Sequence, residues 1–219
     1  MNAAHRYLAH VQDMLHRLEA TQSGAIDRAA ALCADALTAG HRLFVSRDGS
    51  HALHTELVHR AGGFVDLAIL QSDTALRAGD VVIIGTNAGF DASTVGLALR
   101  CRAMGVRTIG ITTVDFERSI DSSDVSGKKL HEVVDVCVDQ GGVTGDAAIA
   151  LLGLDVAAIP SSGVLCLTAA WMILAATAER MIAADRPPRI FQAIQLRGAK
   201  DRNMRLQDQA ARSLSSVRR

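Results

Sequence analysis

The sequence contains few residues of the kinds that mark disulfide-rich or low-complexity proteins. Aromatic residues make up 3% of its 219 residues, and there are only three prolines and four cysteines. The cysteines are widely spaced and form no CxxC pair, which predicts buried free thiols rather than zinc ligands or disulfides. The four positions are Cys33, Cys101, Cys137 and Cys166.

An excess of charge of one sign is also missing. Lys and Arg together number 23, as do Asp and Glu, so the formal net charge is zero. A balanced chain has no broad attraction to nucleic acid or to an anionic membrane. The amphipathic N-terminus is interrupted by charges and supplies neither a signal peptide nor the roughly 20 apolar residues of a membrane span. We therefore expect a cytoplasmic protein without nucleic-acid or membrane partners, and its 49% hydrophobic residues exclude global disorder.

Residues 80–113 are the most informative segment of the chain. Val81 to Ile84 form a continuous run of β-branched residues, typical of a strand buried on both faces of a parallel sheet. A helix with an apolar side follows and ends at Gly105, and Thr108 to Ile111 begin the next strand. The segment therefore predicts a strand, helix, strand crossover.

The loop inside this crossover consists of small residues, Gly85 to Gly89, and Asp91 or Ser93 can cap the helix that follows. A helix N-terminus beside such a loop suits an anion, and Thr112 and Thr113 should stand nearby at the carboxyl end of the next strand. Small residues also form ordinary strand-to-helix turns, so the loop alone leaves both interpretations open.

The remaining pattern alternates helices and strands, with no internal repeat. The chain suits one large α/β domain, 39–186, preceded by an N-terminal helical arm, 1–38, and followed by a basic tail, 187–219. The expected elements are a helix at 4–37 with a break or kink at 22–24, strands at 43–45, 64–70 and 133–138, a helix at 50–60 ended by Gly62, a buried helix at 164–181, and a final helix in the tail.

The order of these elements, the sequence GTNAG before a helix, and the pair Thr112 and Thr113 resemble the SIS (sugar isomerase) domain family. The segments GSHALHTELVHRAGGF, SGKKLHEVVDVCVD, TGDAA and GAKDRN are similar to landmarks of a single-domain bacterial SIS subgroup. The resemblance covers nearly the whole chain. It implies a flavodoxin-like, three-layer α/β fold with a five-stranded parallel sheet flanked by helices. It also implies a homodimer or tetramer that binds a phosphorylated sugar.

The resemblance assigns Thr86, Asn87 and Gly89 to the phosphate loop, whose usual residues are Ser, any residue, Ser and Gly. Ala88 stands where the second Ser is expected. This difference removes one hydroxyl donor, worth roughly 0.5–1.5 kcal/mol against a neutral partner. Phosphate can instead use Thr112, Thr113 and backbone amides.

The first loop also differs from the subgroup, which has a Gly-rich sequence there. This chain has Ser46, Arg47 and Asp48 before Gly49 and Ser50. Arg47 can grip phosphate oxygens with two hydrogen bonds. It can equally pair with Asp48 at the surface.

Glu56 is the candidate catalytic base, at a position similar to the catalytic carboxylate of some SIS isomerases. Partial burial would raise its pKa to a useful value, whereas an exposed Glu56 would pair with Arg60 four residues later. His51 and His54 share a helix face and are candidate acids. With His59 nearby they resemble a metal site only weakly, so we predict neither a metal nor another cofactor.

Ser161 and Ser162 begin the long apolar helix, where they can cap its N-terminus or present hydroxyls to a ligand. The leading functional hypothesis is aldose–ketose isomerisation of a sugar phosphate through an enediol. Two alternatives remain open: a non-catalytic phosphosugar sensor, and a SIS-type lyase or deaminase acting on an amino-sugar phosphate.

Overall fold

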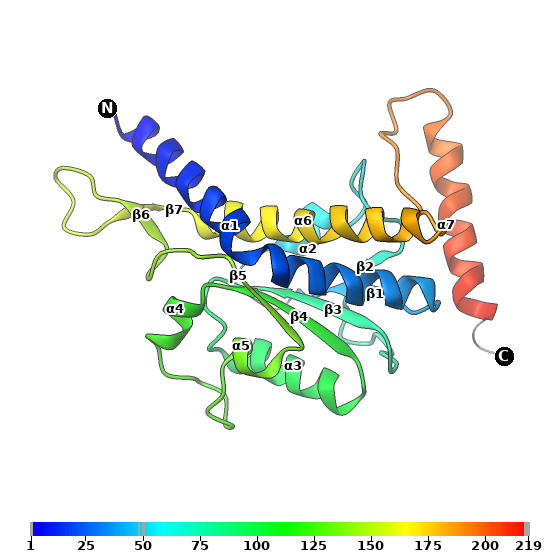
Figure 1. Cartoon of the computed structure of the whole chain (residues 1–219), viewed down its shortest axis with the longest axis horizontal. Helices are drawn as coiled ribbons and strands as arrows, with labels where there is room; N and C mark the ends of the chain where they lie inside the picture. Colours follow the sequence, from blue (N-terminus) through cyan, green and yellow to red (C-terminus); the bar gives the residue numbers. More distant parts are fainter. Residues whose placement is uncertain (1, 48, 50, 217–219) are drawn as a thin grey trace.

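A five-stranded parallel sheet forms the middle layer of the protein. The computed structural model describes residues 2–47, 49 and 51–216 (Figure 1). The strands run in the order β2-β1-β3-β4-β5, all in parallel. This architecture confirms the predicted α/β fold. The strand bounds are β1 Leu43–Val45, β2 Leu67–Ile69, β3 Val81–Gly85, β4 Arg107–Thr112 and β5 Val136–Asp139.

Helices cover both faces of the sheet. Figure 1 shows α1 (Ala3–Thr38) and α6 (Ser162–Ala183) side by side on one face, and α3 (Ala92–Ala103) with the short α5 (Leu130–Val133) on the other. Each face has its own hydrophobic cluster, because the buried strands present apolar side chains in both directions. The N-terminal helix thus belongs to the same core as the sheet.

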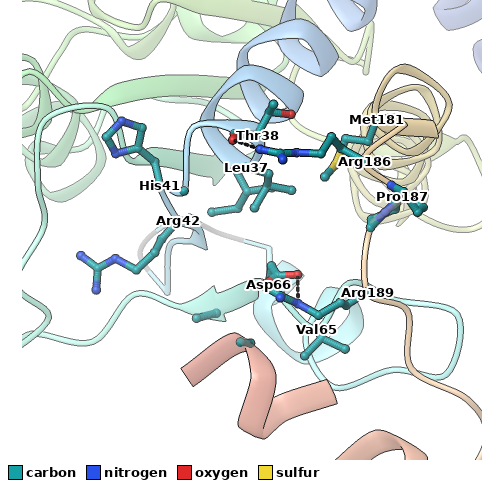
Figure 2. Close-up of a pocket in the computed structure, with 15 residues that line it drawn as sticks. Leu37, Thr38, His41, Arg42, Val65, Asp66, Met181, Arg186, Pro187 and Arg189 are labelled. Carbon is teal, nitrogen blue, oxygen red and sulfur yellow. Dashed lines mark hydrogen bonds and ion pairs between the residues drawn. The ribbon is translucent and has the colours of Figure 1, made fainter. Parts of the chain in front are cut away.

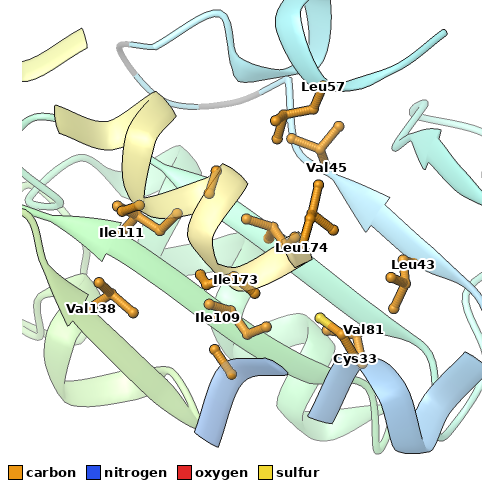
Figure 3. Close-up of a cluster of buried hydrophobic side chains, with 14 of the residues drawn as sticks. Cys33, Leu43, Val45, Leu57, Val81, Ile109, Ile111, Val138, Ile173 and Leu174 are labelled. Atoms are coloured by element: carbon orange, nitrogen blue, oxygen red, sulfur yellow. The ribbon is translucent and has the colours of Figure 1, made fainter. Parts of the chain in front are cut away.

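The core under α6 is made of aliphatic side chains. Figure 3 shows Ile173 and Leu174 of α6 above Ile109 of β4, with Cys33 of α1 beside them, and all four side chains are fully or almost fully buried. Although α6 is long and apolar enough to span a membrane by composition, its buried face packs on α1 and the sheet, as in the core helix of a soluble protein.

The helix α1 runs through residues 22–24 without the expected break. Gly24 lies in an open part of the helix, where a Cβ would meet only the end of Arg28 at 3.7 Å. Figure 1 shows that the helix bends along its length. The Thr21 hydroxyl donates a hydrogen bond to the Arg17 carbonyl, an interaction that often bends helices.

The helix expected at 50–60 is much shorter, since α2 spans Leu53–Leu57. Val58 is already extended, and His59 adopts a left-handed φ of 59°, which ends the helix. The strand expected at 64–70 is also shorter, because Phe64 forms only an isolated bridge with Ile190 and β2 begins at Leu67.

An antiparallel hairpin that the sequence analysis did not predict follows β5. It consists of β6 (Ala147–Ile149) and β7 (Ala158–Pro160), and Figure 1 shows it projecting beside the N-terminal end of α1. Its connecting loop exposes Leu152, Leu154 and Val156. The strand predicted at 133–138 is shifted, because Val133 ends α5 and the strand begins at Val136.

Two further helices complete the chain. The short α4 (Val114–Arg118) follows β4, and α7 (Ala199–Ser216) is the final helix expected in the tail. The amide of Asn203 anchors α7 to the preceding segment through both backbone groups of Gln192.

The four cysteines are free, as predicted. Burial raises the pKa of Cys33 and of Cys137 to about 12 and that of Cys101 to about 11. Burial raises the pKa of Cys166 as well. The thiols are therefore protonated at neutral pH and behave as small apolar side chains.

Candidate functional site

The carboxyl ends of β1, β3 and β4 carry three loops that meet at one edge of the sheet. The strand register places Val45 beside Ile83, and Gly85 beside Ile111, so the residues that follow these strands emerge together. They border a hollow of about 440 Å³. Its lining residues are Gly49, Thr86, Asn87, Ala88, Phe90, Asp91, Ser93 and Phe116.

Gly49 allows the first loop to touch the end of β3. It adopts a φ of +111°, and a Cβ there would lie 2.3 Å from the carbonyl oxygen of Gly85. Any other residue would push the loop away, because that oxygen belongs to the backbone. A glycine here therefore brings residues of the first loop to the hollow.

The remaining first-loop residues differ in accessibility. Ser46 is 2% exposed, and its N–H donates to the Ile83 carbonyl, so it continues the sheet pairing. Arg47 is exposed and donates to the Gln71 side chain at 3.3 Å. Ser50, a predicted phosphate ligand, and Asp48, the predicted partner of Arg47, lie outside the described residues.

The N-terminus of α3 is capped by Asp91, as predicted. Its carboxylate accepts hydrogen bonds from the Thr94 N–H and hydroxyl and from the Ser93 hydroxyl. Although partial burial opposes it, these hydrogen bonds lower the pKa of Asp91, which keeps the carboxylate ionised. The hollow thus has a negative charge at the helix end where the sequence predicted an anion site.

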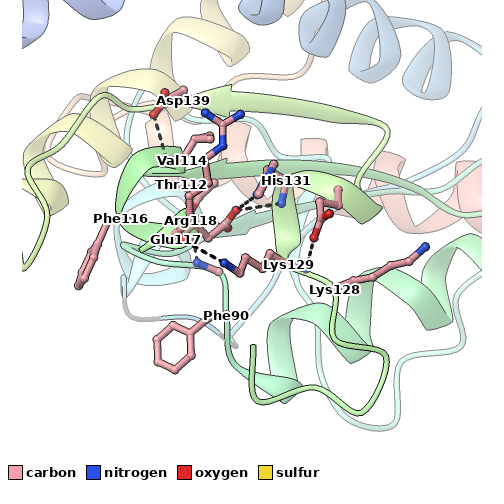
Figure 4. A network of polar contacts seen from close by, with 12 residues as sticks. Phe90, Thr112, Val114, Phe116, Glu117, Arg118, Lys128, Lys129, His131 and Asp139 are labelled. Carbon is pink, nitrogen blue, oxygen red and sulfur yellow. Dashed lines mark hydrogen bonds and ion pairs between the residues drawn. The ribbon is translucent and has the colours of Figure 1, made fainter. Parts of the chain in front are cut away.

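A buried network lies directly behind the loop, on the side away from the hollow (Figure 4). The Gly89 N–H donates to the Thr112 hydroxyl at 3.3 Å, and that hydroxyl donates to Glu117 Oε1 at 3.0 Å. His131 donates to Glu117 Oε2 through its backbone N–H and contacts it through Nδ1. Thr112 is fully buried, so its hydroxyl supports the loop and does not face solvent.

A second network ties the loop to β5. The Gln140 amide donates to the Thr113 hydroxyl at 2.9 Å and to the Thr86 carbonyl at 3.4 Å. Thr113 in turn donates to Asn87 Oδ1 at 3.3 Å. Gln140 is fully buried and its Oε1 has no partner among the described residues.

His51 lies near a second polar cluster at the start of α6. Burial lowers the pKa of His51, while the charge of Asp146 opposes this shift, so the imidazole is neutral at neutral pH. Its Nε2 is buried without a partner among the described residues. A neutral, unpaired imidazole nitrogen at this edge can accept or donate a proton.

Asp146 is the residue that caps α6. Its carboxylate accepts from the backbone N–H groups of Ser161 and Ser162 and from the Ser162 hydroxyl, at 2.7–3.1 Å. The predicted side-chain capping by the two serines is therefore wrong. The Ser161 hydroxyl is 1% exposed and has no partner among the described residues, so it can still serve a ligand that reaches it.

The other candidate acid–base residues on α2 are less enclosed. The Glu56 side chain is 46% exposed and pairs with Arg60 at 3.2 Å, which is the ion pair that the sequence offered as the alternative to a catalytic role. His54 has a buried Nδ1 without a described partner, while the His59 ring packs edge-on against Phe191. Within the described residues, His, Cys, Asp and Glu form no group of three that could hold a metal.

Sequence reasoning missed Glu117, Gln140 and Asp146. Each is polar, follows a strand or a helix turn, and takes its partners from distant segments. Their position in the chain could have indicated a role at the site for two of them. Glu117 and Gln140 come shortly after the carboxyl ends of β4 and β5, where parallel sheets bind ligands.

A cavity at the opposite, amino edge of the sheet looks different. It has about 450 Å³ and lies between the C-terminal ends of α1 and α6 (Figure 2). Its arginines are already engaged: Arg189 pairs with Asp66, and Arg186 donates to the Thr38 carbonyl. The arginines of this cavity therefore already have partners, whereas several buried polar atoms at the carboxyl edge have none among the described residues.

Comparison with known proteins agrees with this geometry. The SIS domain family model matches residues 6–72. The N-terminal part of the chain is therefore similar to a SIS domain. A UPF0309 protein of Streptomyces griseus is 28% identical, covering 88% of this chain and 89% of the relative. A UPF0309 protein of Halalkalibacterium halodurans is 26% identical, covering 85% and 88%. Both relatives are bacterial proteins.

Solved structures show the same fold. A candidate phosphosugar isomerase from Silicibacter pomeroyi aligns with a TM-score of 0.54 and 17% identity, over 80% of this chain and 50% of that one. A candidate phosphosugar isomerase involved in capsule formation, from Bacteroides fragilis, aligns with a TM-score of 0.51 and 18% identity, over 80% and 92%. At these low identities, the two alignments show that the fold is shared and say nothing of activity.

Proposed function

We propose that this protein binds a phosphorylated sugar at the carboxyl edge of its sheet and interconverts the aldose and ketose forms. The observation that carries the proposal is the meeting of three loops at one hollow. His51, whose Nε2 has no partner among the described residues, lies two residues beyond Gly49, which lines this hollow. The SIS fold provides a phosphosugar-binding framework.

The phosphate-binding part of the proposal uses the loop from Thr86 to Gly89. Thr112 and Gln140 hold this loop by hydrogen bonds on two sides, so its backbone is ordered before a ligand binds. Arg47 contributes a positive charge near the first loop, which offsets the charge of Asp91. Thr113 and Ser161 are assigned to the sugar hydroxyls.

Isomerisation requires a base that removes a proton from the carbon next to the open-chain carbonyl. The electron pair of that C–H bond forms a carbon–carbon double bond while the carbonyl oxygen takes up a proton, which gives the enediol. The neighbouring hydroxyl then loses its proton and becomes the new carbonyl, as the first carbonyl carbon takes up a proton. Neutral His51 is suited to moving this proton, and Glu56 is the candidate second group if it leaves Arg60 when substrate binds.

The experiment compares His51→Gln, Glu56→Gln and the wild type, with ligand affinity and turnover measured on a panel of pentose and hexose phosphates. We expect His51→Gln to lose turnover by about 100-fold or more while its affinity stays within threefold. Full activity of Glu56→Gln would remove that residue from the mechanism, and full activity of both variants would overturn the isomerase mechanism. A phosphosugar that binds without turnover would instead favour the sensor.

A homodimer in the cytoplasm is part of the proposal. The exposed Leu152, Leu154 and Val156 of the hairpin loop support it, because an apolar cluster of this kind favours burial against a second copy. We expect light scattering to give twice the monomer mass, and the variant with both Leu152 and Leu154 changed to Asp to give the monomer mass. A monomeric wild type would contradict this assignment.

A SIS-type lyase or deaminase would use the same loop with an amino-sugar phosphate. Product analysis on amino-sugar phosphates distinguishes it, since ether cleavage or ammonia release leaves products that isomerisation does not.

A further inference from the structure

The carboxylate of Glu117 is fully buried directly behind the loop that lines the hollow. A buried carboxylate is costly unless charged or hydrogen-bonding partners surround it, so its presence here needs a reason. Its two oxygens divide their partners: Oε1 accepts from Thr112, and Oε2 meets His131 (Figure 4).

The Thr112 hydroxyl links Glu117 to the loop through two hydrogen bonds. Because this hydroxyl donates its only proton to Glu117, a lone pair points back and accepts the Gly89 N–H. The orientation of the peptide between Ala88 and Gly89 therefore depends on the carboxylate. A neutral acceptor in place of Glu117 would hold the hydroxyl less strongly.

The backbone of Gly89 lies against the carboxylate with no room for a side chain. A Cβ at Gly89 would be 2.2 Å from Glu117 Oε1 and 2.3 Å from Leu130 Cβ. The Gly89 carbonyl is also held, since it accepts from the Leu130 N–H at 2.8 Å. Both backbone groups of this one loop residue are thus fixed by the segments that carry Glu117 and His131.

We propose that Glu117, oriented by His131, is a positioning residue that sets the ligand-binding geometry of the loop 86–89 through the Thr112 hydroxyl. It does not contact the ligand. The inference rests on the proposed function for what the loop binds, but the ordering of the loop itself is a property of the free protein.

The amino edge of the sheet offers a matched control. Asp80 is another buried carboxylate, 1% exposed, that accepts from the Arg42 and Arg77 backbone N–H groups and pairs with the Arg42 guanidinium. Its change to Asn also removes a buried charge from a hydrogen-bonded network. A purely structural role for Glu117 would make the two variants behave alike.

The test compares Glu117→Gln, Thr112→Val, Thr112→Ser and Asp80→Asn in the full chain. Hydrogen exchange of the peptide covering residues 86–90 is measured without ligand at equal distance below each melting temperature. We expect exchange there to rise about tenfold in Glu117→Gln and Thr112→Val. It should stay within twofold of the wild type in Thr112→Ser, which keeps the hydroxyl, and in Asp80→Asn.

Affinity is then measured by calorimetry with inorganic phosphate and with the sugar phosphate that most stabilises the wild type. We expect Glu117→Gln and Thr112→Val to bind about tenfold more weakly, and the other two variants to bind within twofold of the wild type. Unchanged exchange at 86–90 in Glu117→Gln would overturn the proposal. If the wild type binds no compound, the proposed function fails, and the exchange result alone decides the role of Glu117.

Discussion

The two edges of the parallel sheet satisfy their buried polar groups in different ways. At the amino edge, carboxylates pair with guanidinium groups, as Asp80 does with Arg42 and Asp135 with Arg107. At the carboxyl edge, the carboxylates of Asp91 and Asp146 are held by hydroxyls and backbone N–H groups. These two buried or half-buried carboxylates of the amino edge thus have charged partners within the chain.

The carboxyl edge, in contrast, keeps several buried polar atoms unpaired among the described residues. They are Gln140 Oε1, Ser161 Oγ and His51 Nε2. Buried atoms of this kind cost free energy unless something bonds to them. Ion pairs within the chain therefore stabilise the amino edge, whereas the carboxyl edge keeps the hydrogen-bonding capacity that we propose a ligand uses.

Breaking the amino edge should have the largest effect on stability and none on the ligand. We expect Asp80→Ala to lower the free energy of unfolding by about 3–5 kcal/mol, because it leaves Arg42 and two backbone N–H groups without their partner. Urea unfolding measures this loss. A variant that folds but binds no sugar phosphate would show that the two edges are not independent.

Changing Gly89 to Ala should damage both properties of the carboxyl edge. The added methyl would overlap Glu117 and Leu130, so we expect a loss of about 1–3 kcal/mol and a loss of ligand binding. Gly24→Ala is the control, since it adds the same methyl to an open helix position and should stabilise by roughly 0.5–1 kcal/mol. Normal binding by Gly89→Ala would contradict the packing described behind the loop.

Removing the negative charge of Asp91 should strengthen ligand binding and leave stability nearly unchanged. Asn caps helices about as well as Asp does, so Asp91→Asn should keep stability within about 0.5 kcal/mol. Because a negative charge no longer faces the phosphate, affinity for a sugar phosphate should rise by about threefold to tenfold. Calorimetry with the phosphorylated and unphosphorylated sugar measures the change. Weaker binding of the phosphorylated form would place the phosphate elsewhere.

The smallest expected effect concerns pH. Since burial holds the pKa of His51 below its usual value of 6.5, the unfolded chain binds more protons there than the folded protein does. The stability that neutral His51 contributes is present above about pH 6.5 and is lost as the pH falls toward the folded-state pKa. We expect His51→Gln to flatten this decline when unfolding is measured across this pH range. Equal slopes in the wild type and His51→Gln would contradict a depressed pKa of His51.

The sequence predicted the part of the site that depends on local structure. The crossover from Val81 to Thr112, its capping residue Asp91 and the free cysteines follow from β-branched runs, helix capping and spacing. These features are readable because each depends on residues close together in the chain.

The rest depends on contacts between distant segments. Glu117 lies in the short helix α4, whose local sequence does not distinguish a buried carboxylate from an exposed one. It is buried because α5 packs against it and brings His131 to its carboxylate. The shortening of α2 follows from the left-handed His59, whose ring packs on Phe191 more than 100 residues later. Such positions cannot be deduced from local propensity.

A phosphosugar site is tested by a thermal-shift comparison of sugar phosphates, their unphosphorylated counterparts and inorganic phosphate. A ligand at 100 times its Kd stabilises the folded protein by about 2.7 kcal/mol, or roughly 5–10 °C for a chain of this size. We expect a shift of this order with one class of sugar phosphate and little shift with its unphosphorylated form. No shift across the panel, or equal shifts with and without the phosphate, would contradict a phosphosugar site at the carboxyl edge.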